Sequence, residues 1–263
     1  MFSFLQRRPS LRRLLPGGVD AHCHLLPGVD DGAEDMTTAL DIIRAQQALG
    51  LRGAICTPHI MARYPDNTPV ALQARFAELL EAALAAGLNV CSTTDTTVPS
   101  SAFRMHLSAE YMIDSAFPSL LEHPEQLLTI PAELICSTES QGNSEGKAKH
   151  STSVADNQEY ILIELPQYLL PEGWLDVLDS VRACGLTPLL AHPERYLRLL
   201  SESDLTDLHA RGLCYQGNLG SLTGLYGPQV QRLARRLHKA GLYTTFGTDA
   251  HTPGMITKMD IAA

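Results

Sequence analysis

Short apolar runs alternate along this chain with amphipathic stretches of helical period, and several of the runs end in His, Asp or Glu. Four helices are expected, over residues 36–49, 68–86, 174–184 and 229–240. The second begins with the N-cap pair Thr68–Pro69, and each helix is closed by a glycine. Helix, glycine and apolar run in this order are typical of βα units around a parallel sheet.

Seven apolar runs are the candidate strands, at residues 18–21, 52–56, 106–111, 160–165, 186–191, 213–217 and 243–247. Seven such units in 263 residues predict a single α/β domain, a distorted (β/α)7 TIM-like barrel over residues 18–263. A basic segment, residues 1–17, precedes it. Two polar inserts, near 91–104 and 136–157, interrupt the pattern and are expected to be surface loops or disordered segments.

Charge and composition exclude several classes of protein. The chain has 20 Lys and Arg against 29 Asp and Glu, a net charge of −9, which argues against nucleic-acid binding. It has no run of 18 apolar residues, so we expect no transmembrane helix, and its N-terminus lacks the apolar region of a signal peptide. Six scattered cysteines without a CxxC pair indicate reduced thiols in a cytoplasmic protein.

The strongest local signal is the sequence Asp20-Ala-His-Cys-His24 at the end of the first strand. Residues two apart on a strand face the same way, so His22 and His24 would project together. Two imidazoles in this arrangement are typical of a metal site.

Further candidate ligands stand at or just after the ends of later strands. They are Asp31, His59, Glu110, Glu164, His192, Asp249 and His251. In a barrel these ends converge on one face, where active sites lie. Five imidazoles and four carboxylates exceed the needs of one zinc ion and suit two or three divalent ions such as Mn, Fe or Zn. Such ions activate a water as hydroxide near neutral pH, and Arg195 is placed to contact a phosphoryl group.

Seven ordered stretches carry a resemblance to a known family. They are VDAHCHLLPGVDDGA (19–33), TPHIMARYPDNTP (57–69), SAEYMID (108–114), YILIELP (160–166), LAHPERY (190–196), YQGNLGSLTGLYG (215–227) and FGTDAH (246–251). Together they resemble the polymerase-and-histidinol-phosphatase (PHP) superfamily. More narrowly, they resemble its bacterial tyrosine-protein phosphatases of capsular and exopolysaccharide biosynthesis.

The resemblance implies a PHP-fold barrel with a trinuclear, manganese-dependent centre. His22, His24, Glu110 and Asp249 would hold one ion, and Glu110 would bridge to a second with Glu164 and His192. Asp31, His59 and His251 would hold a third, and Arg195 would orient the phosphate. The implied substrate is phosphotyrosine on a partner protein, often the autophosphorylating tyrosine kinase that controls polysaccharide export.

Other interpretations stay open at this point. One is a small-molecule phosphatase of the same superfamily, acting on histidinol phosphate or a similar ester, and another is a non-catalytic, metal-stabilised interaction domain. A metal-dependent amidohydrolase also opens with HxH but commonly has a carboxylated Lys on the fourth strand, where this chain has Glu164. A cysteine-dependent tyrosine phosphatase is disfavoured because no cysteine begins a C-x5-R motif. The sequence permits an oligomer, and the twelve residues after His251 are too few for us to expect a full closing helix.

Overall fold

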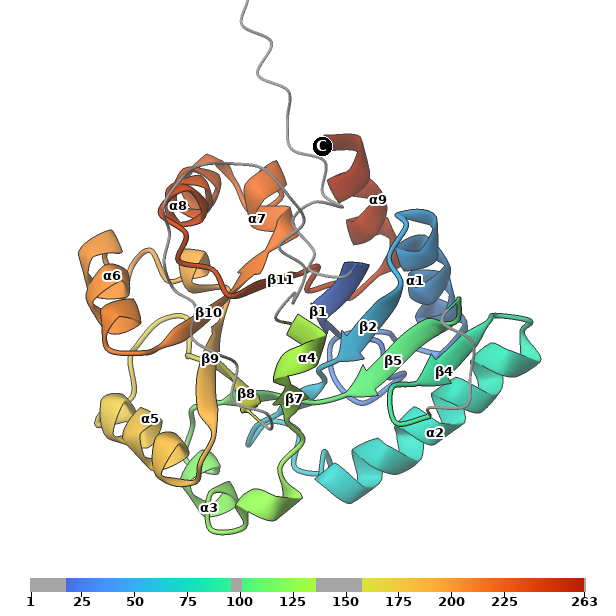
Figure 1. Ribbon diagram of the computed structural model, residues 1–263, viewed down its shortest axis with the longest axis horizontal. Coiled ribbons are helices and arrows are strands. Elements are labelled where there is room, and N and C mark those ends of the chain that lie inside the picture. The colour runs from blue at the N-terminus through green and yellow to red at the C-terminus, as the bar shows by residue number, and fades with distance from the viewer. Residues whose placement is uncertain (1–17, 96–100, 136–157, 263) are drawn as a thin grey trace, which may run out of the picture.

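Parallel strands follow one another around a curved α/β domain in the computed structural model, which describes residues 18–95, 101–135 and 158–262 (Figure 1). One sheet has the order β1-β2-β5-β4, and the other has the order β11-β10-β9-β8-β6-β3 with β7 paired to β8. The strands are β1 (Val19–Cys23), β2 (Gly53–Cys56), β3 (His59–Ile60), β4 (Val90–Ser92), β5 (Phe103–Leu107), β6 (Glu110–Met112), β7 (Ile130–Pro131), β8 (Glu159–Glu164), β9 (Thr187–Ala191), β10 (Cys214–Asn218) and β11 (Thr245–Gly247).

The two sheets join into one barrel wall, because two of its strand positions each consist of two short strands, β2 with β3 and β5 with β6. β2 and β3 are separated by Thr57 and Pro58, and backbone hydrogen bonds still cross this gap, including Ser108 N to Cys56 O (2.8 Å). A parallel bridge between Cys23 and Ala250 then places β1 beside the end of β11. The circuit β1, β2/β3, β5/β6, β8, β9, β10, β11 has the seven positions expected, so the predicted barrel is confirmed.

The third expected strand is wrong in its bounds. Residues 106–111 do not form one strand, because β5 ends at Leu107 and β6 begins at Glu110. Between them the Ser108 hydroxyl donates to Leu128 O (3.0 Å). This offset has a consequence for the site, since it places Glu110 directly opposite His59 in the β3–β6 register.

Helices surround the strands, most of them on the outer side (Figure 1). They are α1 (Met36–Ala48), α2 (Pro69–Ala85), α3 (Phe117–Leu120), α4 (Ala132–Ile135), α5 (Trp174–Ala183), α6 (Glu202–Ala210), α7 (Leu219–Thr223), α8 (Pro228–Lys239) and α9 (Pro253–Ala262), with 3-10 turns η3 (Pro124–Gln126) and η4 (Pro193–Arg195). The four expected helices are confirmed within one or two residues. Thr68 is the N-cap of α2, since its hydroxyl accepts from Ala71 N (3.2 Å).

Two other expectations need correction. The insert predicted near 91–104 is not loop throughout, because its ends belong to β4 and β5, where Cys91 pairs with Arg104 and Phe103 is buried. Apolar residues at the flanks of this Ser- and Thr-rich stretch explain the difference. A closing helix also exists: α9 buries Ile256 and Met259 and packs against α1 and α7. Residues 1–17, 96–100 and 136–157 lie outside the described residues.

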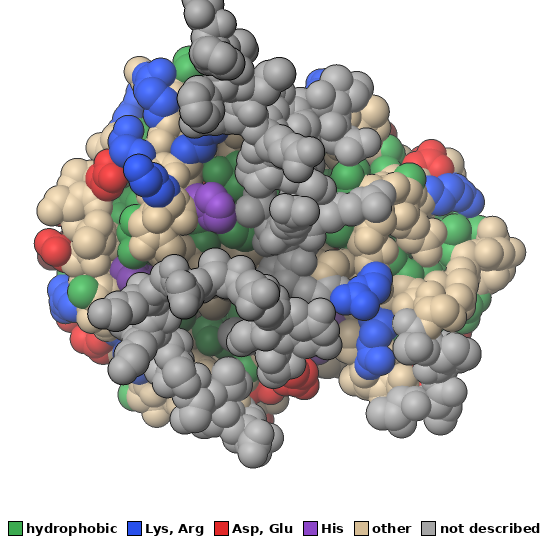
Figure 2. All heavy atoms as spheres, turned by 45° about the horizontal axis from the view of Figure 1, so that its top comes forward, with side chains coloured by type: hydrophobic (Ala, Val, Ile, Leu, Met, Phe, Trp, Pro, Cys, Tyr) green, Lys and Arg blue, Asp and Glu red, His purple; other side chains and the backbone are tan. Residues whose placement is uncertain are grey.

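The core has two parts. The larger part lies between the strands and the outer helices, and the smaller fills the barrel interior. Interior side chains include Ile55, Leu162 and Leu189. Helix α4 covers one end of the barrel (Figure 1), and its Ile135 packs with these side chains. On the outer surface, Lys and Arg side chains gather over α8 (Figure 2). In the part of the chain that the structure describes, no helix is long and apolar enough to cross a membrane.

Candidate metal centre

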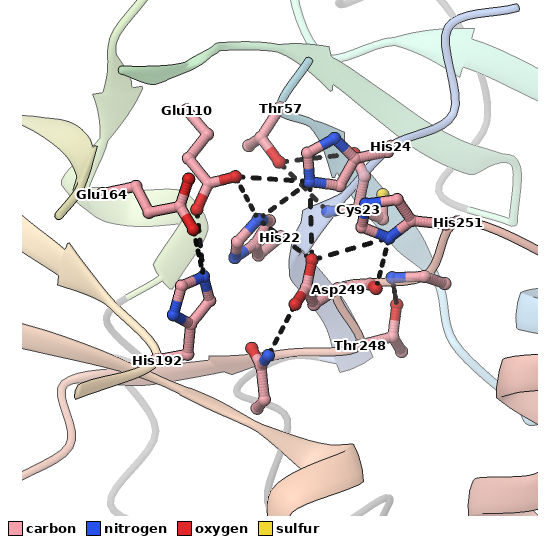
Figure 3. Close-up of polar contacts among 12 residues, drawn as sticks. His22, Cys23, His24, Thr57, Glu110, Glu164, His192, Thr248, Asp249 and His251 are labelled. Carbon is pink, nitrogen blue, oxygen red and sulfur yellow. Dashed lines mark hydrogen bonds and ion pairs between the residues drawn. The ribbon is translucent and has the colours of Figure 1, made fainter. Parts of the chain in front are cut away.

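The nine predicted ligands come together at the carboxyl ends of the strands. Figure 3 shows all of them except Asp31 and His59. Four groups have potential ligand atoms within 4.8 Å of one another: His24, Asp31, His59 and His251; His22, His24 and Asp249; His22, Glu110 and His192; and His59, Glu110 and Glu164. Shared members make the four groups one continuous cluster. Parallel strands deliver these side chains to one place because all their carboxyl ends meet at the same edge.

His22 and His24 both direct their Nε2 atoms into this cluster. The Gln216 amide is oriented by its own donation to Gly217 O (2.8 Å), so its Oε1 accepts from His22 Nδ1 (2.8 Å). His24 Nδ1 donates in the same way to Asp30 Oδ2 (2.9 Å). In the neutral rings the two Nε2 atoms therefore carry lone pairs, yet they lie 3.2 Å apart. Two lone pairs this close repel each other unless a cation, either a proton or a metal ion, lies between them. Burial opposes protonation, but the facing carboxylates raise the pKa of both rings, so the contact attracts positive charge.

Glu110 stands at the centre of the cluster and adds further acceptors. Its Oε2 lies 3.2 Å from His22 Nε2, 3.4 Å from His24 Nε2 and 3.2 Å from His59 Nδ1. That buried His59 nitrogen has no hydrogen-bond partner among the described residues. Carboxylate oxygens and imidazole nitrogens are the ligand types of Mn, Fe and Zn, so the donor set fits divalent metal ions.

The two glutamates are electrostatically unequal in the protein alone. Burial opposes ionisation of Glu110, but the imidazoles of His22 and His59 hold its pKa well below its usual range. Burial and then the carboxylate of Glu110 raise the pKa of Glu164 well above its usual value. A neighbouring cation would stabilise both carboxylates in their charged form, which water cannot do at this depth.

The surroundings of His192 keep its imidazole neutral, which is the form that binds metal ions. Its Nε2 lies 3.2 Å from Glu110 Oε1 and 3.6 Å from Glu164 Oε1. Burial and the Arg195 guanidinium lower the pKa of His192 to about 4, so the ring is uncharged at neutral pH. The residue has a φ of 33°, and Asp249 has a φ of 52°; both are left-handed conformations that cost energy in non-glycine residues. Both residues with this strained backbone are candidate metal ligands.

Asp249 is held from two sides. Its Oδ2 accepts from Arg195 Nη1 (2.8 Å) and from Asn218 Nδ2 (2.7 Å), which leaves Oδ1 facing His22 and His24 at 3.6 and 3.4 Å. Burial would raise its pKa, but His22, His24 and Arg195 lower it below the usual range. Close packing of β11 against β1 fixes the site, because a Cβ on Gly247 would lie 2.5 Å from that of His22.

The third predicted group forms the outer part of the cluster. His59 Nε2 and His251 Nε2 lie 3.5 and 3.6 Å from Asp31 Oδ1. The Asp31 side chain is 56% exposed and that of His251 is 23% exposed, whereas His22, His24 and Glu110 are buried. The centre therefore opens to solvent on the side of Asp31 and His251. Arg195, 23% exposed, lies at the edge with its guanidinium 5.1 Å from the Tyr226 ring centre.

Sequence reasoning missed the residues that orient these side chains. Gln216 and Asn218 lie two positions apart at the end of β10, so their side chains face the same way. This spacing was the signal that could have identified them. Asp30, next to the predicted ligand Asp31, was not a candidate, although its Oδ2 also accepts from His59 N (3.0 Å). Asp20 fixes the last strand end by accepting from Thr248 N (2.7 Å) and Gln46 Nε2 (2.7 Å). None of these contacts is local in sequence, apart from the turn at Asp30.

Comparison with known proteins identifies the family. The model of a family described as capsular polysaccharide synthesis, CpsB/CapC, matches residues 18–94 and 122–257. This chain belongs to the CpsB/CapC family. The match spans the strand ends that carry all the candidate ligands except Glu110.

Two curated relatives of this CpsB/CapC protein are similar over most of their length. The tyrosine-protein phosphatase YwqE of Bacillus subtilis is 28% identical over 89% of this chain and 77% of its own. The putative tyrosine-protein phosphatase CapC of Staphylococcus aureus is 22% identical over the same shares. A chain from the crystal structures of YwqE from B. subtilis and CpsB from Streptococcus pneumoniae, described as unique metal-dependent tyrosine phosphatases, superposes with a TM-score of 0.70. It is 25% identical, over 93% of this chain and 84% of that chain.

Proposed function

We propose that this protein is a metal-dependent protein-tyrosine phosphatase that hydrolyses phosphotyrosine with two or three divalent metal ions. Manganese is the proposed metal, ahead of iron and zinc. The observation that carries the proposal is the pair of Nε2 lone pairs of His22 and His24, which face each other beside Glu110 and Asp249. The named activities of the CpsB/CapC relatives support the same reaction. The nine clustered residues are the proposed metal ligands, and their division among the ions stays a prediction.

The bound ions would supply positive charge to the phosphate oxygens and activate a water at neutral pH. The protein's own part is to position the reactants. Arg195 lies at the edge of the cluster, where its guanidinium, already directed by Asp249, has donors left for a phosphoryl oxygen. The leaving phenol has a pKa of about 10, so the phenolate departs with little acid assistance. The thiols of Cys23 and Cys56, which lie beneath the site, are poor nucleophiles because burial raises their pKa.

We further propose that the physiological substrate is an autophosphorylating tyrosine kinase that regulates capsule or exopolysaccharide synthesis, and that the protein acts in the cytoplasm. The CpsB/CapC family description supports a role in capsular polysaccharide synthesis. The net charge of −9 is consistent with a protein partner and not with nucleic acid.

A turnover assay with three substrates tests the function. The purified chain is stripped with a chelator and reloaded with manganese, and hydrolysis of a phosphotyrosine peptide, a phosphoserine peptide and histidinol phosphate is compared. We expect manganese-dependent turnover that is fastest on the phosphotyrosine peptide and insensitive to iodoacetamide. Preference for histidinol phosphate would identify a small-molecule phosphatase, and metal binding without turnover would identify an interaction domain.

The His24→Ala variant tests the site itself. We expect loss of turnover and of bound metal with an unchanged circular dichroism spectrum, because His24 belongs to two of the ligand groups. Wild-type turnover of this variant at saturating manganese would contradict the assignment. Metal content by elemental analysis gives a second readout that does not depend on activity.

A further inference from the structure

A groove of about 370 Å³ lies between the Gly28–Val29 turn and the loop that leads into α2. This volume is within the range of about 300–1,000 Å³ typical of ligand sites. The lining includes Arg63, Tyr64, Asp66 and Arg75. None of the lining residues is a candidate metal ligand, so the groove lies beside the cluster and not within it.

The groove is nonetheless continuous with the metal centre. Asn67 joins its two walls, because its Nδ2 donates to Val29 O (3.0 Å) and to His59 O (2.7 Å). The Tyr64 ring stacks at 12° to the His59 imidazole, with the ring centres 6.2 Å apart. A chain lying in the groove would therefore reach the solvent-facing side of the cluster, where His59 and Asp31 lie.

Arg63 gives this groove an available positive charge. Its guanidinium lies 5.6 Å from the Tyr64 ring centre and forms no ion pair or hydrogen bond with any described residue. Arg75, by contrast, donates to Glu78 Oε2 (2.7 Å). Asp66 lies on the same wall, so the attraction for an incoming carboxylate is modest and is centred on Arg63.

We propose that this groove binds the residues next to phosphotyrosine in a protein substrate, and that Arg63 selects an acidic residue there. The inference rests on the proposed function and adds a specificity-determining residue to it. Three observations carry it: the groove's contact with His59, the aromatic wall formed by Tyr64, and a guanidinium at Arg63 that has no ion pair among the described residues. The expected substrate is a phosphotyrosine flanked by Asp or Glu.

The test compares two phosphotyrosine peptides that differ only in their flanking residues, Glu in one and Lys in the other. With the manganese-loaded full chain, we expect kcat/KM to be about fivefold higher for the Glu peptide, the upper range for one exposed ion pair. Arg63→Gln should bring the ratio of the two values to about one, and Arg63→Glu should invert it. Raising the salt concentration should shrink the wild-type ratio.

Lys239→Glu is the matched control, because it makes the same change of charge at the end of α8, next to the amino ends of the strands. It should keep the wild-type ratio. Equal rates on the two peptides with wild-type protein, or a ratio unchanged by Arg63→Glu, would overturn the inference while leaving the phosphatase activity established. Absence of turnover on both peptides would instead contradict the proposed function and, with it, this inference.

Discussion

The two ends of the barrel interior are equally buried but chemically opposite. At the amino end, Ile55, Leu162 and Leu189 have no exposed surface and pack under α4. At the carboxyl end, His22 and His24 also have none, and Glu110 is 1% exposed. In the β6–β8 register Glu110 is directly opposite Leu162, so the change from apolar to charged takes place within one pair of neighbouring residues.

This difference shows what each end needs in order to be stable. The apolar end is stabilised by removal of its side chains from water, at roughly 25 cal/mol per Å². The charged end is destabilised by the same burial, because carboxylates lose their hydration and lie near one another. The amino end is therefore complete with the protein alone, whereas the carboxyl end depends on cations.

The largest expected effect comes from Glu110→Gln. The amide keeps the shape of the side chain but removes the charge that faces four imidazoles. We expect turnover of the phosphotyrosine peptide to fall by about 10³-fold or more, since transition-state stabilisation of several kcal/mol is lost. Bound metal should fall with it. Retention of full metal content and full activity would show that the carboxyl end does not depend on this charge.

Leu189→Ala tests the other end. Leu189 is fully buried in the barrel interior, in register with Leu162 and Cys214. The cavity should lower the free energy of unfolding by about 3 kcal/mol. Denaturant unfolding measures this loss, and metal content per folded molecule should stay at the wild-type value. A selective loss of metal without loss of stability would remove the distinction between the two ends.

Asp30→Asn has a smaller effect at the charged end. Asp30 is not a candidate metal ligand, but its carboxylate accepts hydrogen bonds from His24 Nδ1 and from His59 N. Partners that orient a ligating imidazole typically change metal affinity by about tenfold to a hundredfold. We expect manganese affinity, measured by titration of activity and by calorimetry, to weaken by that factor while kcat at saturating manganese changes less. An unchanged affinity would mean that Asp30 stabilises only the local turn, through its contact with Gly32 N.

The smallest expected effect is a pH dependence near the amino end. His106 lies opposite Ile55, and burial lowers its pKa from the usual 6.5. The unfolded chain therefore takes up a proton as the pH falls through about 6.5, before the folded protein does, so the free energy of unfolding decreases. Metal-loaded His106→Gln should lose less stability than wild type between pH 7.5 and 5.5. Parallel profiles for the two proteins would contradict this assignment.

Sequence patterns predicted most of the barrel because its local signals agree. Helix α2 begins at the N-cap Thr68 as expected, and the apolar run of β8 ends at Glu164 as expected. The break between β5 and β6 was missed, since Ser108 and Ala109 are only weak strand formers and no glycine or proline marks the gap. The gap is imposed by contacts of Ser108 with Cys56 and Leu128, which are distant in sequence.

By itself, the sequence determined the order of the βα units and the chemical character of each strand end, because both follow from local periodicity and residue type. Tertiary structure alone decided which imidazole nitrogen faces the cluster, through Gln216 for His22 and Asp30 for His24. It also placed Arg63 and Tyr64 beside His59 in a groove. These arrangements depend on hydrogen bonds and packing between distant strands and loops, which no local pattern specifies.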